Sequence, residues 1–343
     1  MSWEIVMPER RALLEGWLKA ILDRTELDLE PASGDASFRR YWRLSHGGTS
    51  LIAMDAPPGQ EDTTRFVALA RAWRALGLRT PEILQDDPGQ GFVLLEDFGR
   101  LLYLDCLDAA SADRLYGDAL GALAIIQACA PTAGLPLYDG PFLRREMDLF
   151  RDWLLERHLG LSLSGAEEAG LARALEYLID SALEQPQVCV HRDFHSRNLM
   201  VTSASPSPGI LDFQDAVLGP VTYDLVSLLR DCYIAWPRAR VEDWAWGYFG
   251  LAVQSGILGL EREGDFLRWF DLMGVQRHLK ASGIFARLLI RDGKPGYLGD
   301  IPRTLKYVLE VAPAYPPLEG LAELIDGRVL PALAAAASRA PST

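Results

Sequence analysis

The chain has 343 residues, a formal net charge of -13 and a pI near 4.9. This acidity argues against a nucleic-acid partner or an anionic membrane surface, because both need clustered positive charge. No apolar stretch is long enough for a bilayer span. Four widely spaced cysteines form neither a zinc pattern nor a disulfide framework, so we expect a cytoplasmic protein; they are Cys106, Cys129, Cys189 and Cys232.

The first hundred residues predict a small lobe of mixed structure. Apolar side chains recur at helical spacing from Leu14 to Leu22, which indicates an opening amphipathic helix. A second helix is expected from about Asp62 to Leu76, where Gly77 ends it. Strands separated by turn residues are expected near 27–31, 37–44, 50–55, 82–84 and 92–95.

From about residue 100 the apolar pattern becomes helical. Helices are expected near 111–129, 141–158, 165–184, 220–235, 241–256, 263–290, 302–310 and 318–336. The only strands expected in this half flank residues 191–198. The sequence therefore predicts an α+β chain with a small mixed β-sheet lobe over 1–96 and a mainly helical lobe over 97–343.

The most informative segment is the octet His191-Arg192-Asp193-Phe194-His195-Ser196-Arg197-Asn198, whose spacing H-R-D-x-x-x-x-N is that of a kinase catalytic loop. In kinases the loop Asp orients the acceptor hydroxyl, while the loop Asn and a downstream Asp hold magnesium. Apolar runs flank the octet, and a β-hairpin after it would return Asp212 to the side of Asn198. We therefore predict Asp193 as catalytic base, and Asn198 and Asp212 as magnesium ligands.

Two further residues near the octet are interpreted as structural. His191 follows a buried strand, where a histidine usually braces a loop by hydrogen bonding to backbone or to a downstream Asp. Asp224 is expected to organise the loop or to cap the helix that begins beside it. Asp215 is left open between a structural role and a ligand role, in which it would contact magnesium or a substrate hydroxyl.

Together with the octet, Asp212–Asp215 and Gly219–Leu225 give the chain a family resemblance. Over nearly its whole length it resembles the aminoglycoside phosphotransferase and choline kinase family, small-molecule relatives of the protein kinases. Within that family it is most similar to bacterial kinases that phosphorylate the anomeric hydroxyl of N-acetylmuramate and N-acetylglucosamine in peptidoglycan recycling. The stretches that carry this narrower match are 34–41, 53–58, 223–231 and 276–280.

The resemblance implies a bilobal protein-kinase-like fold, ATP and Mg²⁺ as cofactors, and transfer of the γ-phosphoryl group to the C1 hydroxyl of an amino sugar. It places the nucleotide in the small lobe, with a phosphate-covering turn at 33–37 and adenine against the backbone near Glu96. An ordinary hairpin turn and plain buried strand residues stay open as alternatives. The residues expected to bind the nucleotide are Ser33, Gly34, Ser37, Arg40, Leu95, Glu96 and Phe98.

One departure from the protein kinases concerns the cation at the nucleotide. Those enzymes pair a Lys on the third strand with a Glu on the next helix. Here Met54 stands at the lysine position, Arg65-Phe66 stands where the glutamate is expected, and no lysine occurs between Lys19 and Lys280. A different cation must then neutralise the nucleotide; the candidates are Arg39, Arg40 and Arg43.

Basic side chains in the helical half favour an anionic acceptor, because Arg binds carboxylates such as the lactyl group of N-acetylmuramate in a bidentate manner. Most charges on helix faces are nevertheless solvated. The residues expected to bind the acceptor are His195, Arg197, Gln214, Asp215, Arg277 and His278. Two alternatives stay open: another small-molecule kinase of the same fold, for an amino alcohol, another sugar or an aminoglycoside, and a non-catalytic nucleotide-binding scaffold.

Overall fold

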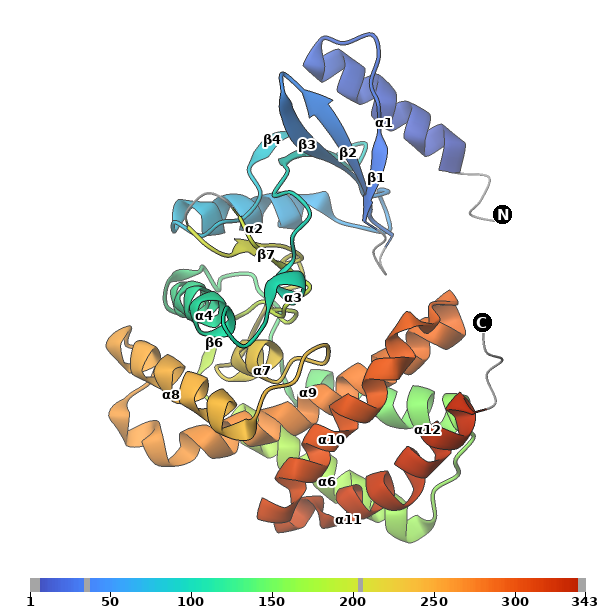
Figure 1. Cartoon of the computed structure of the whole chain (residues 1–343), viewed down its shortest axis with the longest axis vertical. Coiled ribbons are helices and arrows are strands. Elements are labelled where there is room, and N and C mark those ends of the chain that lie inside the picture. Colours follow the sequence, from blue (N-terminus) through green and yellow to red (C-terminus); the bar gives the residue numbers. More distant parts are fainter. Residues whose placement is uncertain (1–6, 34–37, 203–205, 339–343) are drawn as a thin grey trace. The chain divides into compact units, whose positions relative to one another are not determined.

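The computed structural model describes residues 7–33, 38–202 and 206–338, and it separates into two compact units (Figure 1). The first unit comprises Met1–Cys106 and Asn198–Gln214, and the second comprises Leu107–Arg197 and Asp215–Thr343. The first unit therefore extends ten residues beyond the boundary predicted at residue 96, and it includes a hairpin from much later in the chain. No helix of the described residues is both long and apolar enough to cross a bilayer.

A five-stranded antiparallel sheet in the order β1-β2-β3-β5-β4 forms the centre of the first unit. The strands are β1 (Glu30–Ser33), β2 (Arg40–His46), β3 (Thr49–Asp55), β4 (Ile83–Asp87) and β5 (Phe92–Glu96). Helix α1 (Met7–Leu22) packs Leu14 and Leu18 into a core with apolar residues of β2, β3 and β5. This arrangement follows from the apolar spacing that predicted the helix.

Helix α2 (Thr63–Ala75) begins where the side chain of Asp62 accepts a hydrogen bond from the Thr64 N–H at 2.8 Å. Its Phe66 and Trp73 pack against Phe213, with ring centroids 5.0 and 5.5 Å apart. Phe213 belongs to the late hairpin, so this aromatic cluster attaches the hairpin to the first unit.

The hairpin consists of β7 (Leu199–Met200) and β8 (Gly209–Ile210), which pair antiparallel. The N–H of Val201 donates to the carbonyl of Leu101 at 2.9 Å, just before the short helix α3 (Tyr103–Cys106), and the N–H of Ile210 donates to Arg79 at 2.8 Å. A Cβ atom at Gly209 would lie 2.7 Å from the Phe98 ring, so only glycine fits there. These contacts explain why 198–214 belongs to the first unit.

The second unit is mainly helical, and the long helix α9 (Glu263–Asp292) packs against α5, α6, α7 and α10. The other helices are α4 (Ala112–Cys129), α5 (Gly140–Leu149), α6 (Gly165–Leu183), α7 (Tyr223–Leu229), α8 (Arg238–Gln254), α10 (Ile301–Val311), α11 (Glu319–Leu324) and α12 (Leu330–Ala337). A π-helix over Phe150–His158 continues α5. A Cβ at Gly283 would lie 2.3 Å from the carbonyl carbon of Leu149, so this glycine allows α9 to pass close to the end of α5.

The predicted fold class is confirmed, with two local corrections. Strand β9 (Val217–Pro220) pairs antiparallel with β6 (Gln187–Val190), where no such strand was expected. The helix predicted over 220–235 ends at Leu229, because Asp231 accepts hydrogen bonds from the N–H groups of Ser196 and Tyr233, both at 3.0 Å. These contacts hold residues 231–233 beside the octet instead of in a helix.

Candidate active site

The first half of the octet is held in place by Asp224, in the first turn of α7. Its carboxylate accepts hydrogen bonds from the N–H groups of His191 at 2.6 Å and Arg192 at 3.0 Å. Arg192 has a left-handed backbone (φ 80°), a conformation that costs about 1 kcal/mol or more outside glycine. Asp224 thus stabilises a strained turn directly before Asp193, which confirms its predicted structural role. Burial raises the pKa of Asp224 to about 6.

His191 braces the same turn, as predicted. Its side chain is fully buried, and its Nδ1 accepts a hydrogen bond from the Asp193 N–H at 3.3 Å. The imidazole meets the Phe194 ring edge-on, with 5.6 Å between centroids. The backbone around Asp193 is therefore fixed from both α7 and the buried strand β6.

A buried polar cluster lies beside this turn. The carboxylate of Glu146, on α5, accepts hydrogen bonds from Arg192 and Tyr138, and it lies 3.2 Å from Lys280 Nζ. Lys280 also donates to the hydroxyl of Tyr223 at 2.8 Å. Burial would raise the pKa of Glu146, but Lys280 and Arg192 lower it below its usual value. Glu146 could not be predicted from the sequence, because one acidic residue on a charged helix face gives no signal.

Electrostatics keep Asp193 ionised. Burial alone would raise its pKa, but Lys280, His195, Arg192 and Arg277 together lower it to about 2. Burial lowers the pKa of His195 to about 4, so its imidazole is neutral at pH 7. A carboxylate with this pKa accepts a hydrogen bond from a hydroxyl and is a weak proton acceptor. The site therefore favours orientation of an acceptor over full deprotonation by Asp193.

The predicted acceptor residues of the second unit have different environments. Arg197 lies over the rings of Tyr233 and Tyr297, 4.0 and 5.2 Å from their centroids. His278 Nε2 lies 2.9 Å from the Arg230 carbonyl, and its ring stacks on Tyr307. The His278 side chain therefore interacts with other residues of the protein through both its Nε2 and its ring face. Asp215 is exposed just before β9, while His195 is buried, and no partner for its Nδ1 lies among the described residues.

The predicted metal ligands lie together in the first unit. The N–H of Leu211 donates to the Asn198 carbonyl at 3.0 Å, so the hairpin returns Asp212 to the side of Asn198 as predicted. Asp212 has a left-handed backbone (φ 60°), and its Oδ1 accepts a hydrogen bond from Gln214 Nε2 at 2.6 Å. One carboxylate and one amide oxygen suit Mg²⁺, which is commonly held by one or two carboxylates plus substrate phosphates. No cluster of three acidic, His or Cys ligands occurs in the described part of the chain.

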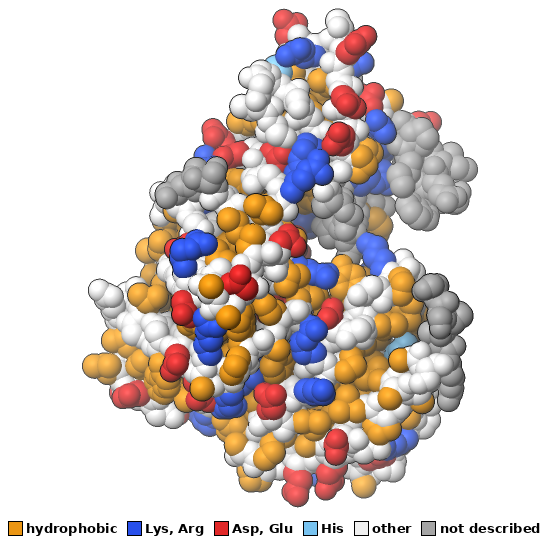
Figure 2. Space-filling view, in the orientation of Figure 1, with side chains coloured by type: hydrophobic (Ala, Val, Ile, Leu, Met, Phe, Trp, Pro, Cys, Tyr) orange, Lys and Arg blue, Asp and Glu red, His pale blue; other side chains and the backbone are white. Residues whose placement is uncertain are grey.

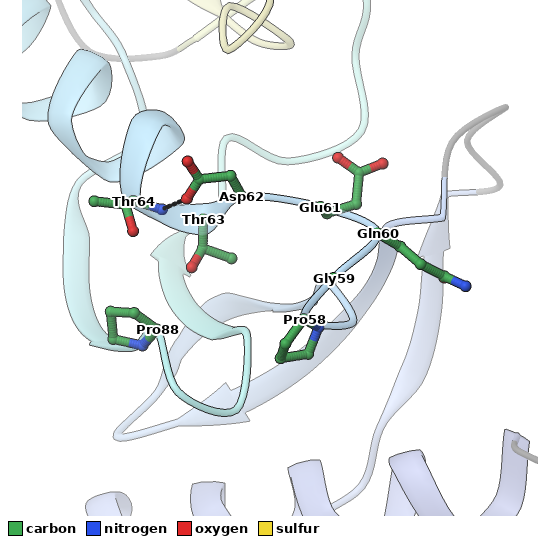
Figure 3. A pocket seen from close by; sticks show the side chains of 8 residues that line it. All are labelled: Pro58, Gly59, Gln60, Glu61, Asp62, Thr63, Thr64 and Pro88. Atoms are coloured by element: carbon green, nitrogen blue, oxygen red, sulfur yellow. Dashed lines mark hydrogen bonds between the residues drawn. The ribbon is translucent and has the colours of Figure 1, made fainter.

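Arg39 is the cation that reaches Asp212. Its Nη1 lies 3.3 Å from Asp212 Oδ1 and its Nε lies 3.0 Å from Glu61 Oε2, and the arginine is buried. Glu61 belongs to the loop between β3 and α2. Residues of this loop, among them Pro58 and Glu61, line an open pocket together with Pro88 (Figure 3). The acidic residue that pairs with Arg39 thus lies before α2, whereas it was expected on the helix itself, near Arg65.

The other two candidate cations have different positions. Arg43 pairs with Asp97 at 2.5 Å and donates to the Gly99 carbonyl at 2.8 Å. Arg40 begins β2 opposite Asp55 and is half-buried. Of the three, Arg39 is the one whose contacts include a predicted metal ligand.

The residues predicted to bind adenine lie around the end of β5. Leu95 is buried in the sheet, and the N–H of Glu96 already donates to the Glu82 carbonyl at 3.0 Å. The Glu96 carboxylate pairs with Arg79 at 2.5 Å, and the Arg79 guanidinium lies 5.2 Å from the centre of the Phe98 ring. Gly34 and Ser37 lie outside the described residues, and only the backbone of Ser33, at the end of β1, is described.

Most basic side chains on the helices of the second unit have partners on the surface. Arg144 pairs with Asp148 at 3.1 Å and Arg151 with Asp152 at 2.9 Å, while Arg157 lies 4.1 Å from the Trp153 ring centre. Figure 2 shows acidic and basic side chains interspersed on the face that it draws. Most of these basic side chains therefore form solvated surface contacts, as expected for charges on helix faces.

These features define a phosphotransferase site, and comparison with known families agrees. Residues 28–256 match the model of the phosphotransferase enzyme family, so the chain belongs to that family. This result confirms the predicted class of small-molecule kinase.

Individual relatives are similar to this chain over most of its length. The N-acetylmuramate/N-acetylglucosamine kinase of Pseudomonas aeruginosa is 49% identical over 311 residues, which cover 91% of this chain and 90% of the relative. The enzyme of the same name from Neisseria meningitidis is 38% identical, covering 92% and 95%.

Solved structures support the fold. The choline kinase of Streptococcus pneumoniae has a TM-score of 0.56 at 12% identity, over 87% of this chain and 98% of that one. An ethanolamine kinase of Plasmodium vivax has a TM-score of 0.62 at 11% identity, over 87% and 86%. The bilobal kinase-like architecture predicted from the sequence is thus confirmed.

Proposed function

We propose that this chain transfers the γ-phosphoryl group of ATP to the anomeric hydroxyl of N-acetylmuramate and N-acetylglucosamine. The observation that carries the proposal is the 49% identity, over about nine-tenths of both chains, to a kinase named for these two sugars. Retention of Asp193, Asn198 and Asp212 supports catalysis over a silent scaffold, which has no chemical need for this set of residues.

In the proposed reaction Asp193 accepts a hydrogen bond from the C1 hydroxyl and aligns its oxygen for in-line attack on the γ-phosphorus. A hemiacetal hydroxyl is more acidic than an ordinary alcohol, so the weakly basic carboxylate of Asp193 is adequate. Asp224 and His191 hold the backbone that presents it. Arg197, His195, Gln214 and Asp215 are proposed to contact the sugar.

On the nucleotide side, Asn198 and Asp212 are proposed to hold Mg²⁺, which when bound neutralises charge on the phosphate oxygens. Arg39 adds a fixed positive charge beside Asp212. This pairing of Arg39 with Glu61 fulfils the electrostatic role of the lysine–glutamate pair in protein kinases. Adenine is proposed to lie against Leu95, Glu96 and Phe98, with Ser33, Gly34, Ser37 and Arg40 nearer the phosphates.

The biological setting follows from the substrates. Both sugars are components of peptidoglycan, and phosphorylation at C1 would return them to use as activated sugar phosphates. We therefore place the enzyme in cytoplasmic peptidoglycan recycling, acting on a small amino sugar and not on a nucleic acid or a membrane.

The test is an assay of purified protein with ATP, Mg²⁺ and each sugar, followed by location of the phosphate on the product by NMR. Coupling of phosphorus to the anomeric proton is the expected result. Phosphate at C6 would overturn the anomeric assignment. Faster ADP release with choline or an aminoglycoside than with either sugar would reject the amino-sugar acceptor.

A further inference from the structure

Arg277 is a buried cation that has no carboxylate within ion-pair distance among the residues that the structure describes. Four basic side chains of the described residues are buried, and three of them have carboxylates within ion-pair distance: Arg39, Arg230 and Lys280. Arg277 is 6% exposed, and within the described part of the chain its Nη1 donates a hydrogen bond to the uncharged thiol of Cys232 at 3.5 Å. Burying a guanidinium costs free energy, and among the described residues no carboxylate lies within ion-pair distance of Arg277 to offset that cost directly, so an anionic group of a ligand can do so.

The position of Arg277 connects it to the octet. Its partner Cys232 directly follows Asp231, whose carboxylate holds the N–H of Ser196 at 3.0 Å. One turn further along α9, Lys280 contacts Glu146, which also binds Arg192. Burial opposes the charge of Arg277, but Cys232, Tyr223, Asp193 and Asp231 still raise its pKa above the usual value. All these residues belong to the second unit, so Arg277 lies among the groups that surround Asp193.

We infer that Arg277 binds the carboxylate of the acceptor and thereby sets the preference between an acidic and a neutral amino sugar. The inference rests on the proposed function, because the two sugars differ in the lactyl carboxylate that only N-acetylmuramate carries. A guanidinium matches a carboxylate with two parallel N–H···O bonds. Its neighbour His278 does not have this role, since its Nε2 is engaged by the Arg230 carbonyl.

The principal alternative ligand for Arg277 is the phosphoryl group that is being transferred. A contact with that group would assist both sugars equally, whereas a contact with the lactyl carboxylate assists one of them. Arg277 also lies in the unit that contains Asp193, while Arg39, Asn198 and Asp212, the residues proposed for the nucleotide, lie in the other unit. The location therefore favours the acceptor.

The test compares Arg277→Gln with wild type on both sugars. Loss of a charge-assisted bond predicts that kcat/KM for N-acetylmuramate falls by about 30-fold or more, mainly through KM. For N-acetylglucosamine we expect a change of less than about 3-fold. Arg268→Gln is the matched control, because it removes the same charge from the surface of the same helix. An equal loss on both sugars would overturn the inference.

A second variant and a binding measurement separate misfolding from loss of recognition. Arg277→Met replaces the guanidinium with an apolar side chain of similar length and breaks no ion pair among the described residues, so its Tm should stay close to that of wild type. Saturating N-acetylmuramate should raise the Tm of wild type and leave that of Arg277→Met unchanged. A marked drop in the Tm of the free variant, or an undiminished ligand shift, would contradict the inference. If wild type phosphorylates neither sugar, the proposed function fails, and the ligand shift still tests Arg277 by itself.

Discussion

The carboxylate of Glu146 pairs with the guanidinium of Arg192, the residue directly before Asp193. Arg192 has the left-handed backbone that turns the chain into the octet. Glu146 is buried and also binds Lys280, so one carboxylate on α5 links the strained turn to α9. Glu146 is therefore a positioning residue, which acts on Asp193 through Arg192.

Replacing Glu146 with Gln should impair both stability and turnover. The variant leaves buried Lys280 and half-buried Arg192 without their shared anion, which predicts a loss of about 3 kcal/mol or more in the free energy of unfolding. We expect kcat to fall at least about 10-fold with a small change in the KM for ATP. Urea unfolding and steady-state kinetics measure both effects. Glu242→Gln, which breaks the surface pair with Arg238, should stay within about 1 kcal/mol of wild type.

Replacing Asp193 with Asn should lower kcat by about 10²- to 10⁴-fold, because it removes the anionic hydrogen-bond acceptor for the attacking hydroxyl. Nucleotide affinity should stay close to that of wild type, since the residues proposed for the nucleotide are unchanged. Calorimetric titration of an ATP analogue and a turnover assay provide the two measurements. Asp180→Asn, at an exposed position of α6, controls for the loss of one charge. Unchanged turnover would remove Asp193 from its proposed role.

Replacing Arg39 with Met should raise the KM for ATP by about 10- to 100-fold, because the cation beside Asp212 is lost. Arg39→Lys keeps the charge and should recover part of this loss. The neighbouring Arg40→Met should raise the same constant less than Arg39→Met does, since among the described residues it is Arg39 that contacts Asp212. The opposite ranking would identify Arg40 as the nucleotide cation.

His278 predicts a pH dependence of stability. Burial lowers its pKa to about 3, whereas an unfolded histidine titrates near 6.5. Between these values the unfolded chain binds one more proton than the folded chain at this site, so stability falls as the pH falls. One proton corresponds to about 1.4 kcal/mol per pH unit.

The variant His278→Gln should remove this part of the dependence while keeping an N–H that can reach the Arg230 carbonyl. The free energy of unfolding in urea, measured for variant and wild type from pH 7 to pH 4.5, should differ less between the two proteins as the pH falls. Comparison with wild type is needed because His195 acts in the same direction, with a pKa near 4, while Asp224 acts in the opposite one, with a pKa near 6. Parallel curves would show that His278 does not titrate as described.

The sequence predicted the elements well wherever apolar spacing was long and regular. Helix α9, expected over 263–290, spans Glu263–Asp292, and α4 begins within one residue of its predicted start. Short elements were harder, because β9 has only four residues and includes Gly219 and Pro220. Its pairing with β6 depends on tertiary contacts that no local pattern reveals.

The motif located Asp193, Asn198 and Asp212, but the surrounding groups required coordinates. Glu61 and Arg39 are 22 positions apart, and Glu146 and Arg192 are 46 apart, so their pairing follows from the fold and not from spacing. The sequence could not predict that Arg277 lacks an ion-pair partner among the described residues, because this depends on which carboxylates lie near it in the folded chain.

The lysine-free stretch between Lys19 and Lys280 has a practical consequence for detecting this enzyme. Tagging by acylation of an amine beside the nucleotide phosphates needs a lysine at that place. Where an arginine takes that place, the guanidinium stays protonated and resists acylation. With Arg39 as the proposed nucleotide cation, we expect such tagging to overlook this protein, and an inhibitor that requires a covalent bond to that lysine to have nothing to react with.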